Sequence, residues 1–110
     1  MLDRREALRR LKEIAEECGA EREEVLKVIL FGSLAEGRAV PGSDADILII
    51  LRRSERDFHD RTREYIGFFD QLGMPVEILA YTEEEFRHLV EGGNRFLKRA
   101  LERGITLFER

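Results

Sequence analysis

The sequence predicts one small domain of the α/β (α+β) class over residues 1–110, with a mixed β-sheet of about three to five strands and flanking helices. Two observations lead to this fold class. Apolar runs of strand length alternate with amphipathic stretches of helical spacing, which is typical of layered α/β domains. The connections after the third apolar run are short, which allows strands of mixed direction.

The first third of the chain predicts a helix followed by a strand. Asp3 with Glu6 resembles a capping box, and Gly19 is a typical helix stop, so we expect a helix over about residues 3–18. The segment 25–31 is mostly apolar and β-branched, which predicts a strand.

The middle of the chain predicts a short helix over residues 33–39, a turn at 41–43 and a strand over 47–51. The turn has the sequence Pro-Gly-Ser, which interrupts regular structure. The strand is an unbroken apolar run, as expected for a strand that is covered on both faces.

The second half of the chain predicts further helices and strands from their start and stop signals. Ser54 with Asp57 restarts a helix, which Gly73 and Pro75 end, and Thr82 with Glu85 forms a capping box. In chain order, we expect a helix from about residue 54 to 72, a strand at 76–81, a helix beginning at Thr82, a helix around 96–101 and a strand at 105–108.

The composition excludes several classes of protein. With 43% hydrophobic residues, the 110-residue chain can form an ordinary core, which excludes global disorder. No apolar run approaches the roughly 20 residues of a membrane helix, so we expect no membrane association. The net charge is −4 and no long basic run is present, which argues against general nucleic-acid binding.

The first residues and the cysteine content favour a cytoplasmic location. Residues 1–6 contain acidic side chains and lack an apolar centre, so we expect no secretory signal there. Cys18 is the only cysteine, which excludes an internal disulfide and a multi-cysteine metal site, and we expect it in the core. His59 and His88 lie among charged residues and are expected on the surface.

Two aspartates at the start of the strand over 47–51 form the first candidate for chemistry. Residues i and i+2 of an extended chain point to the same face, so Asp44 and Asp46 should project together. Like charges this close repel each other unless a cation lies between them, and Mg²⁺ is commonly held by one or two carboxylates plus substrate phosphates. A solvated turn with an aspartate pair fits the same pattern.

Gly32 and Ser33 form the second candidate, at the end of the preceding strand. Glycine lets the backbone approach a ligand closely, and a helix start offers free N–H groups to a phosphate. The alternative is an ordinary glycine turn with a serine cap. Because this pair precedes the acidic pair by a short segment, an anion site beside a cation site is favoured, which is the layout of phosphoryl or nucleotidyl transfer.

Glu77 is the third candidate, because it interrupts an apolar strand. A glutamate on a buried strand is costly unless it is paired or bound to a metal. If this strand lies beside the one that begins near Asp46, Glu77 can reach the same metals. On an exposed edge strand, Glu77 would simply face solvent.

The combination resembles the nucleotidyltransferase superfamily of the DNA polymerase β type, and most closely its minimal branch, the MNT proteins. That family has an apolar-Gly-Ser motif, about ten residues, Asp-x-Asp and a later acidic residue. Here these are Phe31-Gly32-Ser33, Asp44-Ala45-Asp46 and Glu77. The likeness covers about residues 25–81 and implies the nucleotidyltransferase fold.

The resemblance implies a reaction and a set of roles. Asp44, Asp46 and Glu77 would be catalytic and would hold two Mg²⁺ ions. Gly32 and Ser33 would bind the phosphates of an NTP, which we expect to be ATP. Arg38 and Ser43 complete the set of nucleotide-binding residues that the resemblance implies. An acceptor hydroxyl would attack the α-phosphate and release pyrophosphate.

One departure from the family motif concerns position 36. Many relatives have Gly-Ser-x-Ala-Arg-Gly, whereas this chain has Glu36 in place of the basic residue, with Arg38 close by. A carboxylate near a triphosphate is unfavourable unless it points away. The third acidic residue is Glu77 where Asp is commoner, and glutamate is still a competent ligand.

Three functions remain open from the sequence. The first is an active enzyme that transfers AMP to a partner protein, since minimal members are often paired with a helical HEPN toxin whose tyrosine they modify as antitoxin. The second is an antitoxin-like module that binds such a partner without catalysis, which Glu36 favours. The third is a small-molecule adenylyltransferase of the antibiotic-modifying kind. A homo-oligomer is compatible with each.

Overall fold

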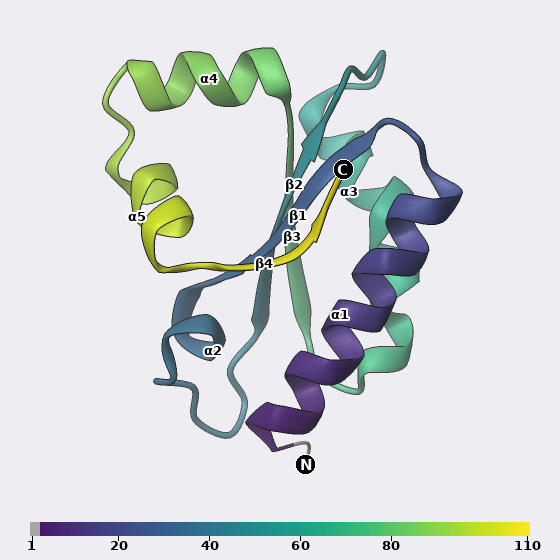
Figure 1. The fold of residues 1–110 in the computed structure, drawn as a ribbon, viewed down its shortest axis with the longest axis vertical. Coiled ribbons are helices and arrows are strands. Elements are labelled where there is room, and N and C mark those ends of the chain that lie inside the picture. Colours follow the sequence, from purple (N-terminus) through teal and green to yellow (C-terminus); the bar gives the residue numbers. More distant parts are fainter. Residues whose placement is uncertain (1–2) are drawn as a thin grey trace.

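A four-stranded sheet lies at the centre of the protein in a computed structural model that describes residues 3–110 (Figure 1). Helices alternate with strands along the chain, as the sequence predicts. The elements are α1 (Arg4–Glu21), β1 (Val25–Phe31), α2 (Gly32–Glu36), β2 (Ala45–Leu51), α3 (Phe58–Ile66), the 3₁₀-helix η1 (Gly67–Leu72), β3 (Val76–Thr82), α4 (Glu83–Glu91), α5 (Arg95–Arg103) and β4 (Ile105–Glu109).

The sheet has the strand order β3-β2-β1-β4 and mixed strand directions. β1 is antiparallel to both β2 and β4, whereas β2 and β3 are parallel. The parallel pair is joined through α3 and η1, the longer connection that parallel strands require. The predicted mixed sheet is therefore confirmed, with β3 and β4 at its edges.

Two apolar layers cover the sheet. On one face, α1, α3 and η1 pack against β-strand residues such as Leu30, Ile47 and Ile49. On the other face, Phe86 of α4 and Leu97 of α5 pack against the alternate strand residues. β1 and β2 are thus buried on both sides, which explains their unbroken apolar sequences. Figure 1 shows α1 and α3 on one side of the sheet and α4 and α5 on the other.

The helix α1 continues past Gly19, although this glycine was the predicted stop. Gly19 is buried, and a Cβ atom at this position would overlap the ring of Phe108 on β4. Close packing of α1 against β4 therefore accounts for the glycine, and the helix ends where the N–H of Arg22 donates to the carbonyl of Cys18.

Three other boundaries differ by a few residues from the sequence expectations. The short helix α2 begins at Gly32 and ends at Glu36. β2 begins at Ala45, so Asp46 lies within the strand. The helix predicted to start near Ser54 begins only at Phe58, because Asp57 is its N-cap and accepts from the N–H of Asp60. It consists of α3 followed by η1, because the chain tightens into a 3₁₀-helix after Ile66.

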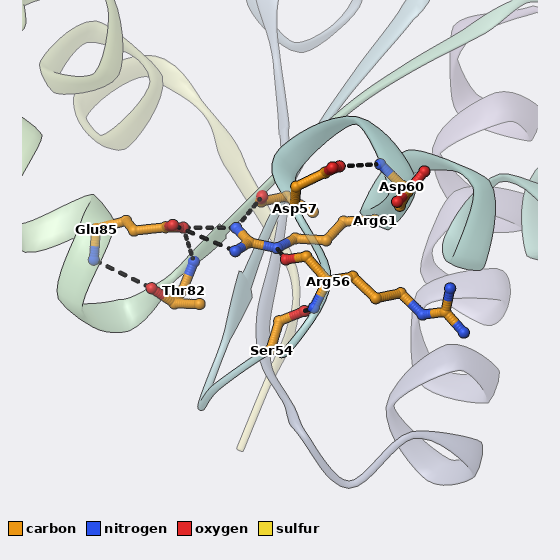
Figure 2. A network of polar contacts seen from close by, with 8 residues as sticks. Ser54, Arg56, Asp57, Asp60, Arg61, Thr82 and Glu85 are labelled. Carbon is orange, nitrogen blue, oxygen red and sulfur yellow. Dashed lines mark hydrogen bonds and ion pairs between the residues drawn. The ribbon is translucent and has the colours of Figure 1, made fainter.

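Arg61 of α3 ties this helix to the start of α4 (Figure 2). The side chain of Arg61 is only 5% exposed, and both of its terminal nitrogens donate to the Glu85 carboxylate. Arg61 also donates to the backbone carbonyls of Arg56 and Ala80. Glu85 in turn accepts from the N–H of Thr82, which confirms the predicted capping box.

The expectations for isolated residues agree with the structure. Cys18 is buried, and burial raises the pKa of its thiol to about 12. His59 and His88 are exposed. Among residues 3–110, every helix is too short or too polar to cross a bilayer. Met1 and Leu2, which belong to the segment expected to lack a secretory signal, lie outside the described residues.

Candidate active site

Asp46 and Glu77 lie side by side on neighbouring strands. The parallel pairing of β2 with β3 places Asp46 opposite Glu77, so their side chains point to the same face of the sheet. This is the face that carries α4 and α5, because Leu48 and Leu79 follow at the next positions on that face. Glu77 lies on an edge strand and is exposed.

The Asp46 carboxyl has an environment that disfavours its charge. Burial is the main cause that raises its pKa, and the negative charges of Glu77 and Asp44 raise it further. Asp44 precedes β2 and is exposed. Glu77 and Asp44 are therefore both close enough to Asp46 to act on its carboxyl electrostatically.

Gly32 brings the backbone against the Asp46 carboxylate. Its φ is +77°, a conformation that favours glycine, and a Cβ atom there would overlap the carboxylate of Asp46. The antiparallel pairing of β1 with β2 creates this approach, because Phe31 lies opposite Asp46. The glycine of the predicted motif thus lies directly beside one of the predicted carboxylates.

A cavity of about 400 Å³ opens over these residues, a volume within the usual range of ligand sites. Its charged side chains include both signs. Three lining residues are acidic and two are basic, namely Glu36, Asp46, Glu77, Arg38 and Arg99. A ligand in this cavity can therefore contact both positively and negatively charged side chains.

Glu36 lies in this cavity as the partner of two arginines. Its carboxylate accepts from Nε of Arg99 at 3.2 Å and from Nη2 of Arg99 at 2.6 Å. Nη2 of Arg38 lies 3.5 Å from the same carboxylate. The hydrogen bonds from Arg99 are the largest cause that lowers the pKa of Glu36. The negative charge at position 36 is thereby compensated.

Aromatic and aliphatic side chains form the rest of the cavity wall. Phe96 of α5 packs edge-on against Phe31 of β1, with 5.4 Å between the ring centroids. Phe96 remains 57% exposed although it is a large apolar residue. Leu79 of β3 completes this part of the wall.

Two predicted nucleotide-binding residues do not line this cavity. Ser33 follows Gly32 in the first turn of α2. Ser43 lines a separate cavity between α1 and the loop that follows α2. The hydroxyl of Ser43 accepts from the N–H of Val40 at 3.0 Å, so it stabilises the turn before β2.

The predicted metal ligands fit a divalent cation by their chemistry. As placed, no group of three or more His, Cys, Asp or Glu side chains within residues 3–110 is arranged to hold a metal ion. The adjacent carboxylates of Asp46 and Glu77 nevertheless supply the oxygen ligands that Mg²⁺ prefers. Their mutual repulsion, which raises the pKa of Asp46, is what a bound cation would relieve.

The structure also adds residues that motif reading did not find. Phe96 and Arg99 reach the cavity from α5, more than fifty residues after Gly32 in the sequence. The sequence predicted only that Phe96 and Arg99 belong to a helix around 96–101. The one available signal was charge, because residues 95–103 contain four basic side chains and one acidic side chain in an acidic protein.

Comparisons with known proteins identify the family and the fold of this chain. The sequence profile of the nucleotidyltransferase domain family matches residues 11–107. No match was found among curated proteins.

Solved structures with the same fold include a protein from Sulfolobus solfataricus that is described as a predicted nucleotidyltransferase. The two chains are 23% identical with a TM-score of 0.69, and the alignment covers 97% of this chain and 84% of the other. A protein provisionally named a minimal nucleotidyltransferase is 26% identical with a TM-score of 0.65, and the alignment covers 94% of this chain and 95% of the other.

A third similar structure is a complex of the tri-AMPylated HEPN toxin of Shewanella oneidensis with an MNT antitoxin. Its matching chain is 14% identical with a TM-score of 0.61, and the alignment covers 94% of this chain and 73% of the other. Because the family match spans most of the sequence and the sheet and its flanking helices agree with these structures, the chain belongs to the nucleotidyltransferase domain family.

Proposed function

We propose that this protein transfers AMP from ATP to a hydroxyl group and releases pyrophosphate. The observation that carries the proposal is the adjacency of Asp46 and Glu77 across β2 and β3, with the backbone of Gly32 against Asp46. Cation ligands and a close backbone approach thus occur together in a cavity that also contains two arginines. Nucleotidyl transfer uses this combination of charges.

The side chains have distinct roles in this proposal. Asp44, Asp46 and Glu77 would hold two Mg²⁺ ions, which, when bound, stabilise the charge on the attacking and leaving oxygens. Gly32 and Ser33 would orient the phosphates of ATP, aided by Arg38 from the loop before β2. Ser43, expected from the sequence to bind the nucleotide, lines a separate cavity, and its proposed part is to hold the turn before β2.

The proposed step exchanges one phosphorus–oxygen bond of ATP for another. The acceptor oxygen forms a bond to the α-phosphorus, and the bond from this phosphorus to the oxygen that bridges to the β-phosphate breaks. The hydroxyl proton passes to the carboxylate of Glu77, which lies exposed at the edge of the sheet and open to an acceptor. Pyrophosphate leaves with the bonding electrons.

The acceptor in this proposal is a hydroxyl on a partner protein of the helical HEPN kind, which makes the chain an antitoxin. The fold similarity to the MNT antitoxin in complex with a tri-AMPylated HEPN toxin supports this part of the proposal. The exposed position of Glu77 on an edge strand is compatible with an acceptor as large as a protein.

The environment of Glu36 favours catalysis over a binding module that lacks activity. An isolated carboxylate at this position would repel a triphosphate. Because Arg99 and Arg38 both lie against Glu36, its charge is compensated before any nucleotide enters. The main sequence argument for an inactive protein is thereby weakened.

Label transfer tests the proposal directly. The protein, Mg²⁺ and α-labelled ATP are incubated with a lysate of the source organism, beside the Asp44→Asn/Asp46→Asn variant and the control Asp70→Asn. Asp70 is an exposed acid of η1, on the opposite side of the sheet from the cavity. We expect a labelled protein band with the wild type and the control, and none with the double variant.

The other possible outcomes of the label-transfer experiment would each contradict part of the proposal. A labelled small molecule would indicate a small-molecule adenylyltransferase. Equal labelling by the double variant would disprove the role of the two aspartates. No label from any of the four NTPs, with a partner still captured by the protein, would replace the enzyme proposal by the binding module.

A further inference from the structure

The helix α5 is a basic element of an acidic protein. Its nine residues include four basic side chains and one acidic side chain, whereas the whole chain has a net charge of −4. Leu97 and Ala100 hold the helix on the sheet, and Phe96 and Arg99 line the cavity that contains Asp46. Of its basic side chains, Arg99 is the one that lines the cavity with the predicted metal ligands Asp46 and Glu77.

Only one edge of the Arg99 guanidinium group forms hydrogen bonds within residues 3–110. Nε and Nη2 donate to the two carboxylate oxygens of Glu36, at 3.2 and 2.6 Å, in a bidentate pair. Nη1 has no hydrogen-bond partner within residues 3–110, and the Arg99 side chain is 60% exposed. The guanidinium therefore has a second edge that is free for an acceptor.

Glu36 is the more buried member of this pair. Its side chain is 12% exposed, and it belongs to α2, which follows directly after β1. A flexible arginine on a surface helix loses much conformational entropy when it binds a ligand. Its bidentate pairing with a fixed carboxylate removes part of this cost in advance.

We propose that Arg99 binds the polyphosphate of the nucleotide through its free edge, and that Glu36 is the positioning residue that orients it. The proposal rests on the proposed function for the identity of the ligand. Arg99 lies in one cavity with Asp46 and Glu77, so a polyphosphate that enters can contact the guanidinium and the carboxylate-bound cation together. Arg99 of α5 thus supplies the positively charged side chain that many relatives have at position 36.

The competing explanation is that Glu36 only obstructs the site. In that case, removal of its charge would strengthen the binding of any polyphosphate. If Glu36 orients Arg99, the same change weakens binding, because the guanidinium loses its fixed partner. The sign of the effect of Glu36→Gln therefore separates the two explanations.

Isothermal titration calorimetry with inorganic triphosphate, ATP and adenosine, each in the presence of Mg²⁺, provides the test. The variants are Arg99→Gln, Arg99→Lys, Glu36→Gln and the double variant Glu36→Gln/Arg99→Gln. Arg103→Gln is the control, because Arg103 is exposed on the same helix and does not line the cavity. Circular dichroism and thermal melting check that each variant is folded.

We expect Arg99→Gln to weaken the binding of triphosphate and of ATP by about tenfold, since a bidentate charged contact is lost. Arg99→Lys should lie between Arg99→Gln and the wild type, because it keeps the charge without the planar fork. Glu36→Gln should weaken binding by about threefold, and the double variant should bind no more weakly than Arg99→Gln. Adenosine binding and the Arg103→Gln control should not change.

The inference is overturned if Arg99→Gln binds triphosphate like Arg103→Gln, if Glu36→Gln binds it more tightly, or if the wild type does not bind it at all. Should Arg99→Gln fail to fold, Arg99→Lys decides, because wild-type affinity in that variant would contradict a bidentate contact. Triphosphate binding that depends on Arg99 without label transfer would disprove AMP transfer and leave the phosphate site standing.

Discussion

Gly32 combines an unusual backbone conformation with a close contact to the candidate metal ligand Asp46. Its φ of +77° disfavours any side chain, and a Cβ atom there would overlap the Asp46 carboxylate. Gly37 has nearly the same backbone, with a φ of +78°, yet a Cβ built on it would have no atom of residues 3–110 within 4 Å, apart from its own chain neighbours. The two glycines therefore separate backbone strain from the contact with Asp46.

We expect Gly32→Ala to reduce label transfer on the order of a hundredfold, because it displaces Asp46 from its position. Gly37→Ala should cost only about 1 to 2 kcal/mol of stability from backbone strain and should retain most of the activity. Label transfer and urea denaturation of both variants provide the measurement. Equal activity of the two variants would show that the approach of Gly32 to Asp46 is unimportant.

At the scale of elements, the contact between Arg61 and Glu85 fastens α3 to the start of α4. Arg61→Gln is expected to lower the free energy of unfolding by about 2 to 3 kcal/mol at pH 7, as charged hydrogen bonds of a buried group are lost. Arg63→Gln, an exposed change on the same helix, is the control. Urea denaturation measures both.

The same contact predicts a pH dependence of stability. Hydrogen bonds from Arg61 are the largest cause that holds the pKa of Glu85 below its ordinary value of 4.5. A lowered pKa in the folded state stabilises the fold above the unfolded value and loses this effect as the pH falls through the folded value. The difference in stability between wild type and Arg61→Gln should therefore shrink below about pH 4.5. A constant difference down to pH 3 would contradict this origin.

At the scale of the whole molecule, the ionised Asp46 carboxylate of the candidate site lowers the free energy of unfolding. Burial, Glu77 and Asp44 raise the pKa of Asp46, so the folded state binds this proton more tightly than the unfolded state does. Above both pKa values, the ionised carboxylate therefore destabilises the fold. Such a cost is typical of functional sites.

We expect Asp46→Asn to raise the melting temperature of the ligand-free protein by about 2 °C at pH 7. Mg²⁺ should raise the melting temperature of the wild type and have little effect on the variant, because the cation relieves a repulsion that the variant lacks. Differential scanning calorimetry with and without Mg²⁺ measures both effects. A lower melting temperature for Asp46→Asn without Mg²⁺ would contradict this explanation.

Most of the fold was predictable from sequence because local signals coincide with the elements. The apolar run of β2 and the capping box of Thr82 and Glu85 agree with the structure. Gly19 was misread because its reason is a contact with Phe108, which lies in a distant strand. Local pattern cannot reveal a contact between α1 and β4.

In the candidate site, too, some residues could be predicted from the sequence and others could not. The sequence left open whether Glu77 lies beside Asp46 or faces solvent on an edge strand. The structure shows both, since β3 is an edge strand, Glu77 is exposed and the register places it opposite Asp46. The role of these carboxylates as metal ligands stays a prediction. Arg99 was not found, because a helix that carries several arginines does not reveal which one faces a cavity. Only the fold assigns it to Glu36.

The pairing of β4 with β1 sets when the cavity can form during folding. Lys27 pairs with Glu109, about 80 residues later, so a long loop must close before this edge of the sheet exists. α5 directly precedes β4 and is fixed from that side only once the loop has closed. Without the pairing of β4, the strands β1, β2 and β3 could still bring the carboxylates and Arg38 together, but Arg99 would lose the support of β4. We therefore expect tight polyphosphate binding to depend on the pairing of β4 with β1.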